Sequence, residues 1–225
     1  ILYTTSEDAN ENLLKEGGDP KNIIFVGNIM IDTLFNQKVD AEKSNYYSLL
    51  GLTKKDYILL TLHRPSNVDN KDTFNSIIQA LLTIANEKKI ILPTHPRTKQ
   101  KIYDLNLMSN FNFDGIKENK INAIDPIGYN EMIDLLDNCY CTLTDSGGIQ
   151  EESTALNIPC LTLRNNTERP ITVSEGTNEV VGTNTDAIIQ AYNNIPNREL
   201  IQKRPKLWDG KTSERILSHL NSVIK

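Results

Sequence analysis

Short apolar runs alternate with amphipathic stretches along most of this chain. From residue 57 onward, runs typical of buried strands are separated by segments whose apolar residues recur every three or four positions, as on one face of a helix. The runs predict strands at Tyr57–Thr61, Lys89–Leu92, Ile121–Ile124, Tyr140–Thr144, Cys160–Leu163 and Glu179–Val181. The intervening segments predict helices near Thr73–Asn86, Lys99–Met108, Tyr129–Asn138, Gly148–Asn157 and Thr185–Asn193. This alternation indicates an α/β fold: a Rossmann-like, doubly wound parallel sheet with helices on both faces.

The two ends of the chain have different patterns. Residues 1–5 indicate the end of a strand, residues 6–16 a helix, and residues 23–26 another strand. An amphipathic helix follows Gly27, and the polar stretch from Asn36 to Asn45 is typical of a linker. A final helix over residues 212–224 carries one apolar stripe, which needs a surface to pack on. The stripe consists of Ile216, Leu217, Leu220 and Val223.

Charge and length narrow the possible partners. The chain has 225 residues, and its 24 Lys and Arg are outnumbered by 29 Asp and Glu, giving a net charge of -5. Its basic residues form no stripe, so we expect no nucleic-acid partner. No apolar run approaches the roughly 20 residues of a membrane span, so we expect no membrane partner. The chain begins at Ile1 with neither a methionine nor a signal peptide, and we interpret it as a fragment.

The cysteines indicate the compartment. Cys139, Cys141 and Cys160 lie inside or beside predicted buried strands, and no C-x-x-C pair is present. We interpret them as reduced core residues of a cytoplasmic protein, the alternative being a metal or redox role.

The most informative motif is the sequence TDSGGIQEE, which ends at Glu152. It joins a strand to a helix, so the N–H groups of Ser146, Gly147 and Gly148 are expected to point outward, unpaired, where a helix N-terminus attracts phosphate. Glu152 lies one turn into the helix, placed to accept hydrogen bonds from a pair of sugar hydroxyls. Alternatively, Ser146 is only a helix cap, and Glu151 and Glu152 are solvated residues favoured by the helix dipole.

Polar clusters also follow three other predicted strands. Because the carboxyl ends of parallel strands meet at one edge of the sheet, these clusters are expected to surround the glycine turn. They contain His63, Arg64, His95, Arg97, Arg164 and Arg169. This concentration of donors in an acidic chain suits a diphosphate. Alternatively, the histidines are loop residues satisfied by the backbone, and Arg64, Arg97 and Arg164 hold the loops by pairing with carboxylates. His219, on the final helix, is assigned no role.

Several motifs follow one another along the chain, and their order identifies a family resemblance. Besides TDSGGIQEE, they are Gly27-Asn28-Ile29-Met30-Ile31-Asp32, His63-Arg64, Pro93-Thr94-His95-Pro96, Asp125-Pro126, Thr167-Glu168-Arg169-Pro170 and Asp209-Gly210. Together they resemble the carboxyl-terminal portion of the non-hydrolysing UDP-N-acetylglucosamine 2-epimerases. The resemblance implies a glycosyltransferase-B-like architecture, with two Rossmann-like domains facing a cleft. Residues 1–26 would then be a remnant of the first domain, 27–208 the UDP-binding domain, and 209–225 a helix returning to the first.

The same resemblance implies an activity. UDP is eliminated across C1 and C2 of the sugar and re-added with inverted configuration at C2, so that UDP-N-acetylglucosamine becomes UDP-N-acetylmannosamine without a nicotinamide cofactor or a metal. The acid and base carboxylates of the family lie upstream of this chain, which is therefore expected to bind the UDP-sugar substrate and to be inactive alone. The whole protein is expected to be a homodimer.

The resemblance also assigns roles to individual residues. His63, the single catalytic assignment on this chain, holds the phosphates with Arg64, Ser146, Gly147 and Gly148, while Glu152 holds the ribose, Arg169 a phosphate or the sugar, and Met132 lies near the uracil. His95 alternatively belongs to a regulatory UDP-sugar site. Two other functions stay open: an epimerase of a modified UDP-N-acetyl sugar, and the nucleotide-sugar domain of a glycosyltransferase.

Overall fold

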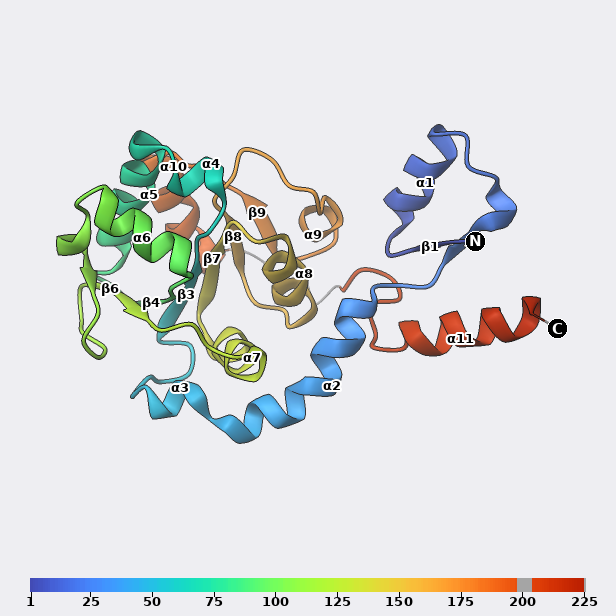
Figure 1. Ribbon diagram of the computed structural model, residues 1–225, viewed down its shortest axis with the longest axis horizontal. Coiled ribbons are helices and arrows are strands. Elements are labelled where there is room, and N and C mark those ends of the chain that lie inside the picture. The colour runs from blue at the N-terminus through green and yellow to red at the C-terminus, as the bar shows by residue number, and fades with distance from the viewer. Residues whose placement is uncertain (198–203, 225) are drawn as a thin grey trace.

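Two parallel sheets organise the chain (Figure 1). The structure is a computed structural model that describes residues 1–197 and 204–224. The predicted units 27–208 and 209–225 include residues 198–203 and 225, which lie outside the described residues. The small sheet pairs β1 (Leu2–Thr4) with β2 (Ile23–Phe25). The large sheet has seven strands in the order β5-β6-β4-β3-β7-β8-β9.

The large sheet confirms the predicted Rossmann-like, doubly wound fold. Its strands are β3 (Tyr57–Thr61), β4 (Lys89–Pro93), β5 (Phe111–Asn112), β6 (Ile121–Ile124), β7 (Cys141–Thr144), β8 (Cys160–Thr162) and β9 (Asn178–Val180). Each neighbouring pair is parallel. The chain builds outward from β3 to one edge and then returns to place β7 on the other side of β3. The point where the strand order reverses, where open α/β sheets bind ligands, therefore lies between β3 and β7.

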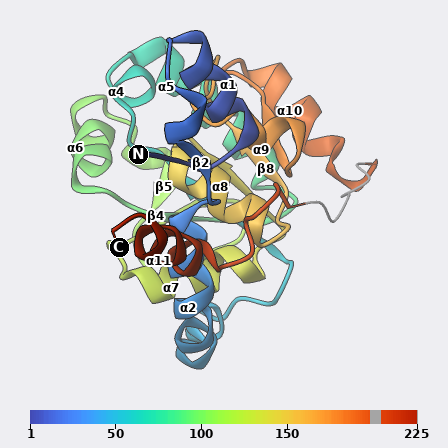
Figure 2. The same cartoon turned by 90° about the vertical axis from the view of Figure 1, so that its right-hand side faces the viewer.

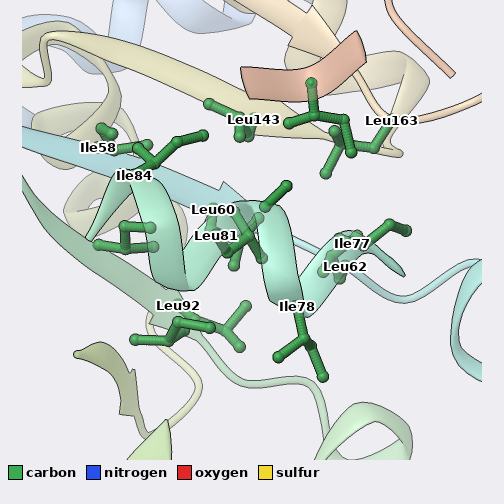
Figure 3. Close-up of a cluster of buried hydrophobic side chains, with 14 of the residues drawn as sticks. Ile58, Leu60, Leu62, Ile77, Ile78, Leu81, Ile84, Leu92, Leu143 and Leu163 are labelled. Carbon is green, nitrogen blue, oxygen red and sulfur yellow. The ribbon is translucent and has the colours of Figure 1, made fainter. Parts of the chain in front are cut away.

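Helices cover both faces of the large sheet. One face packs against α5 (Lys71–Ile84), α6 (Pro96–Asp104) and α10 (Thr185–Asn193), and the other against α2 (Ile29–Ser44), α7 (Tyr129–Asn138) and α8 (Gly147–Ala155). Along β3, Ile58 and Leu60 point to the α5 side (Figure 3), whereas Tyr57 and Leu59 point to the α7 side. Both sets are buried, so β3 appears in the sequence as a continuous apolar run.

The prediction of a linker at residues 36–45 is wrong, because α2 continues to Ser44. Ala41 is 1% exposed in the core formed with α7, and Lys38 forms a 2.9 Å ion pair with Asp137 of that helix. The stretch is polar because only one of its sides faces α7. Packing against α7 therefore stabilises a helix whose own apolar signal is weak. The helix ends at Asn45, whose left-handed φ of 46° terminates it.

Smaller differences concern helix ends and short elements. The helix expected at Lys99–Met108 is α6 (Pro96–Asp104), which begins early because Pro96 suits a first helical turn and ends before Asn106, at φ 57°. Periodicity cannot reveal elements of two to four residues. Those it missed are α3 (Tyr46–Leu49), α4 (Pro65–Val68), α9 (Ile171–Ser174), β5 and the 3-10 turns at Pro20–Asn22, Met108–Asn110 and Ile195–Asn197.

The final helix, α11 (Thr212–Val223), lies next to α2 and the small sheet (Figure 2). Asp32 of α2 accepts hydrogen bonds from the N–H groups of Thr212 at 3.0 Å and Ser213 at 2.7 Å. His219 contacts the Tyr3 hydroxyl at 3.0 Å. The predicted apolar stripe is partly at the surface, with Leu217 61% exposed. Polar contacts of the first helical turn and of His219 therefore hold α11 in place.

Helix α1 (Glu7–Lys15) packs against the small sheet. None of the described helices combines the length and the apolar character that crossing a membrane requires. The three cysteines are buried, as predicted.

Candidate functional site

The loops that follow β3 and β7 are joined by Asp145, a carboxylate with no exposed surface. It accepts hydrogen bonds from the N–H of His63 at 3.0 Å, the N–H of Arg64 at 2.8 Å and the side-chain amide of Asn67 at 3.2 Å. These donors offset the cost of burying the charge. Asp145 belongs to the TDSGGIQEE motif, but the sequence alone predicts no role for it. In the structure it fixes the β3 loop against the glycine turn.

Asp145 also orients the imidazole of His63. The ring Nδ1 lies 3.1 Å from Asp145 Oδ1, and the side chain is 41% exposed. Because Nδ1 faces the carboxylate, Nε2 is the ring nitrogen available to a ligand. The imidazole of His63 is thus oriented and accessible, and its role in binding a ligand stays a prediction.

The glycine turn starts α8 and leaves its first N–H groups available. Gly147 and Gly148 are the first two residues of the helix, so their N–H groups have no acceptor within it, and the side chain of Ser146 caps none of them. One expectation is wrong: the N–H of Ser146 donates to Thr144 Oγ1 at 2.9 Å. A β-carbon added to Gly148 would lie 3.9 Å from its nearest neighbour, Ser146 Oγ. The turn therefore keeps open space beside unsatisfied donors.

Glu152 is buried rather than solvated, with 6% exposure. Its Oε1 accepts a 2.9 Å hydrogen bond from the Tyr129 hydroxyl. Burial raises the pKa of Glu152 to about 7, the Tyr129 hydrogen bond opposes this shift, and the neighbouring charge of Glu151 adds to it. When it is ionised, a carboxylate as buried as this one binds hydroxyl donors readily, because water competes poorly for it.

Glu151 is also buried, at 7% exposure, which overturns its alternative assignment as a solvated residue. Its Oε1 accepts a 3.0 Å hydrogen bond from the Asn28 side-chain amide and lies 3.0 Å from Nε of Arg169. Burial raises the pKa of Glu151, while the charge of Arg169 opposes the shift. Sequence reasoning missed this cluster, because Asn28 is 123 residues from Glu151.

Two hollows flank the glycine turn. A cavity of about 320 Å³ is lined by His63, His95, Met132, Ser146 and the apolar Ile149, among others. The structure thus brings both predicted histidines and Met132 into one place. A cleft of about 440 Å³ lies on the other side, between α1 and the Arg169 loop, and Asn28 and Glu151 contribute to it. The turn therefore lies between an apolar cavity and a cleft to which the charged residues Glu151 and Arg169 contribute.

The other arginines pair with carboxylates, the loop-holding alternative considered for them. Arg64 lies 3.5 Å from Glu168, Arg164 lies 3.0 Å from Glu168, and Arg97 lies 2.6 Å from Asp69. The ring Nδ1 of His95 accepts the N–H of Arg97 at 3.2 Å and so caps the N-terminus of α6. A ligand-binding role for Arg64 and a regulatory role for His95 stay predictions.

Comparison with known proteins identifies the family of this chain. Residues 1–221 match the family described as UDP-N-acetylglucosamine 2-epimerase. A UDP-N-acetylglucosamine 2-epimerase of Methanocaldococcus jannaschii is 42% identical over 96% of this chain and 59% of its own length. A UDP-2,3-diacetamido-2,3-dideoxy-D-glucuronate 2-epimerase of Pseudomonas aeruginosa is 34% identical over 98% of this chain and 59% of its own length.

Solved structures show the same likeness. The crystal structure of the M. jannaschii UDP-GlcNAc 2-epimerase in complex with UDP-GlcNAc and UDP has a TM-score of 0.87 and 39% identity, covering 99% of this chain and 61% of that one. Sheet and helices place the chain among the Rossmann-like second domains of glycosyltransferase-B-like proteins. More particularly, it belongs to the UDP-N-acetylglucosamine 2-epimerase family. The chain spans about three fifths of the length of these relatives.

Proposed function

We propose that this chain is the UDP-binding part of a UDP-N-acetylglucosamine 2-epimerase that interconverts UDP-N-acetylglucosamine and UDP-N-acetylmannosamine. The observation that carries the proposal is the family match along residues 1–221. The open glycine turn at the strand-order reversal supports it, because a diphosphate binds well at such a turn. As its domains we propose residues 1–26, 27–208 and 209–225, with the boundaries inferred from the sequence.

Each part of UDP has a matching group at this site. The diphosphate binds the N–H groups of Gly147 and Gly148, with His63 and Arg169 as charged or polar donors at either side and Ser146 and Arg64 next to them. The uracil enters the apolar cavity beside Met132. The ribose hydroxyls donate to Glu152. The sugar then lies in the 440 Å³ cleft, where Arg169 and Glu151 meet α1.

The proposed reaction is elimination followed by re-addition. A base removes the proton at C2 while the C1–oxygen bond to UDP breaks, and the electron pair of the C2–H bond forms the C1–C2 double bond of a 2-acetamidoglucal. UDP then re-adds at C1 as a proton returns to the opposite face of C2. Donors that stabilise the charge developing on UDP lower the barrier to bond cleavage. The groups that move the proton are proposed to lie outside these residues, so the chain alone binds UDP without turnover.

Isotope exchange tests this reaction. The whole protein, incubated with UDP-N-acetylglucosamine in heavy water, is expected to place deuterium at C2, detected by mass spectrometry or NMR. Transfer of the sugar to an acceptor without C2 exchange would establish a glycosyltransferase instead.

The same assay with UDP-2,3-diacetamido-2,3-dideoxy-glucuronate tests the second candidate substrate, which the 34% identity to the P. aeruginosa enzyme favours. Light scattering of the whole protein tests the expected homodimer.

The variant Gly148→Ala separates binding from folding. Its free energy of unfolding is expected to stay the same or rise by up to about 1 kcal/mol, because alanine favours a helix and meets open space. UDP affinity is expected to fall at least about tenfold, because the methyl group takes the place of the approaching phosphate. Calorimetric titration and urea unfolding measure the two quantities. Gln190→Ala, on the exposed side of α10, is the control for helix propensity. UDP affinity unchanged in Gly148→Ala contradicts the assignment.

A further inference from the structure

The hydrogen bond between Tyr129 and Glu152 has no part in the role proposed above for Glu152, and Tyr129 has so far been given no role. Tyr129 is the first residue of α7, and Glu152 lies in the middle of α8. The phenol is 2.9 Å from Glu152 Oε1. Burial and the charge of Glu152 raise the pKa of Tyr129, so the phenol keeps its proton and is the donor. The bond therefore engages one of the two oxygens of the buried carboxylate.

This pair lies beside the cavity proposed for the uracil. Met132 lines that cavity and is three residues after Tyr129, on the same face of α7. Ile149 lines it from α8 and is three residues before Glu152. Both helices thus present a cavity residue and, one turn along, a member of the pair. A nucleoside whose base fills the cavity has its ribose next to Glu152.

We propose that Tyr129 is a positioning residue for the ribose: its hydroxyl holds Glu152 Oε1 and leaves Oε2 to accept hydrogen bonds from the ribose hydroxyls. This inference rests on the proposed binding of UDP and deepens it. A buried carboxylate without this donor would turn more freely and would be harder to keep ionised, since a hydrogen bond to the charged form favours that form. Tyr129 thus acts on the nucleotide through Glu152.

The ionisation of Glu152 gives the proposal a distinctive signature. Burial is the main reason for its raised pKa of about 7, Tyr129 of α7 opposes the shift, and Glu151 of α8 reinforces it. The ionised form of Glu152 accepts the hydrogen bonds of the ribose hydroxyls. The affinity for UDP is therefore highest above the pKa of Glu152 and falls as the pH drops through it. Removing the Tyr129 hydroxyl raises the pKa further and moves that loss to higher pH.

Titrations of Tyr129→Phe with UDP test the proposal. At pH 6.5 to 7 we expect binding about 3- to 10-fold weaker than in the wild type, and at pH 9 within about twofold, because one pKa unit is a factor of ten. With 2′,3′-dideoxyuridine diphosphate, which lacks the ribose hydroxyls, wild type and variant are expected to bind alike at every pH. Tyr103→Phe, at a tyrosine 49% exposed on α6, is the matched control and is expected to change neither affinity.

The outcomes distinguish this inference from the function on which it rests. Equal weakening for both ligands at all pH values would show that Tyr129 acts only through packing, and tighter UDP binding would show that its hydroxyl competes with the ribose. Either result, or no effect of Tyr129→Phe at any pH, overturns the inference while UDP binding stands. Failure of the wild type to bind UDP overturns both.

Discussion

Asp145→Ala is expected to lower the free energy of unfolding by about 3–5 kcal/mol, because it leaves three donors without their acceptor. Two of the donors are the backbone N–H groups of His63 and Arg64, and the third is the amide of Asn67, which is 2% exposed. Asp145→Asn keeps the shape and one oxygen, so an intermediate loss is expected. Urea unfolding followed by circular dichroism measures these differences.

Asp125→Ala is the matched control for Asp145. Its side chain is 94% exposed, so its removal is expected to change stability by less than about 0.5 kcal/mol. A loss in Asp145→Ala no larger than in the control would show that the carboxylate does not join the two loops. The variant Asp145→Asn, which is expected to lose less stability than Asp145→Ala, is also expected to bind UDP more weakly. Its His63 imidazole loses the charged partner that orients it.

Arg169→Ala is expected to weaken UDP binding by about 1.5–3 kcal/mol, the contribution of hydrogen bonds to a charged group. Arg169→Lys recovers only part of this, because an ammonium lacks the planar fork of a guanidinium. Glu151→Gln is expected to cause a smaller loss, since the carboxylate 3.0 Å from Arg169 Nε positions the guanidinium. Calorimetric titration with UDP measures all three affinities.

A double-mutant cycle shows whether Glu151 acts through Arg169. Once Arg169 is alanine, Glu151→Gln is expected to change UDP affinity no further, because the side chain that it positions is gone. Arg164→Ala is the control, since Arg164 lies in the same loop and pairs with Glu168. If Arg164→Ala weakens binding as much as Arg169→Ala, the effect is one of general charge. Additive losses in the double variant would contradict positioning by Glu151.

Much of the fold could be predicted because its signal is local. Every predicted strand from β3 to β9 is present, and central strands such as β3 are the plainest in the sequence because a strand buried on both faces needs a continuous apolar run. The exception in the sheet is β5, whose two residues are too short to show a pattern. Helix α2 was predicted only in its first half. Its second half depends on the packing of Ala41 and Lys38 against α7, which no local pattern contains.

The sequence by itself determined the strand-helix alternation, the family and the position of the glycine turn, because these follow from apolar periodicity and from residues adjacent in the chain. Only the tertiary structure decided how the surrounding groups pair. Asp145 accepts donors from residues about 80 positions away, and Glu151 meets Asn28 across 123 positions. Tyr129 reaches Glu152 from another helix. Such pairs depend on the distances that packing sets between elements, because a buried carboxylate takes its hydrogen-bond donors from whichever elements packing brings near it.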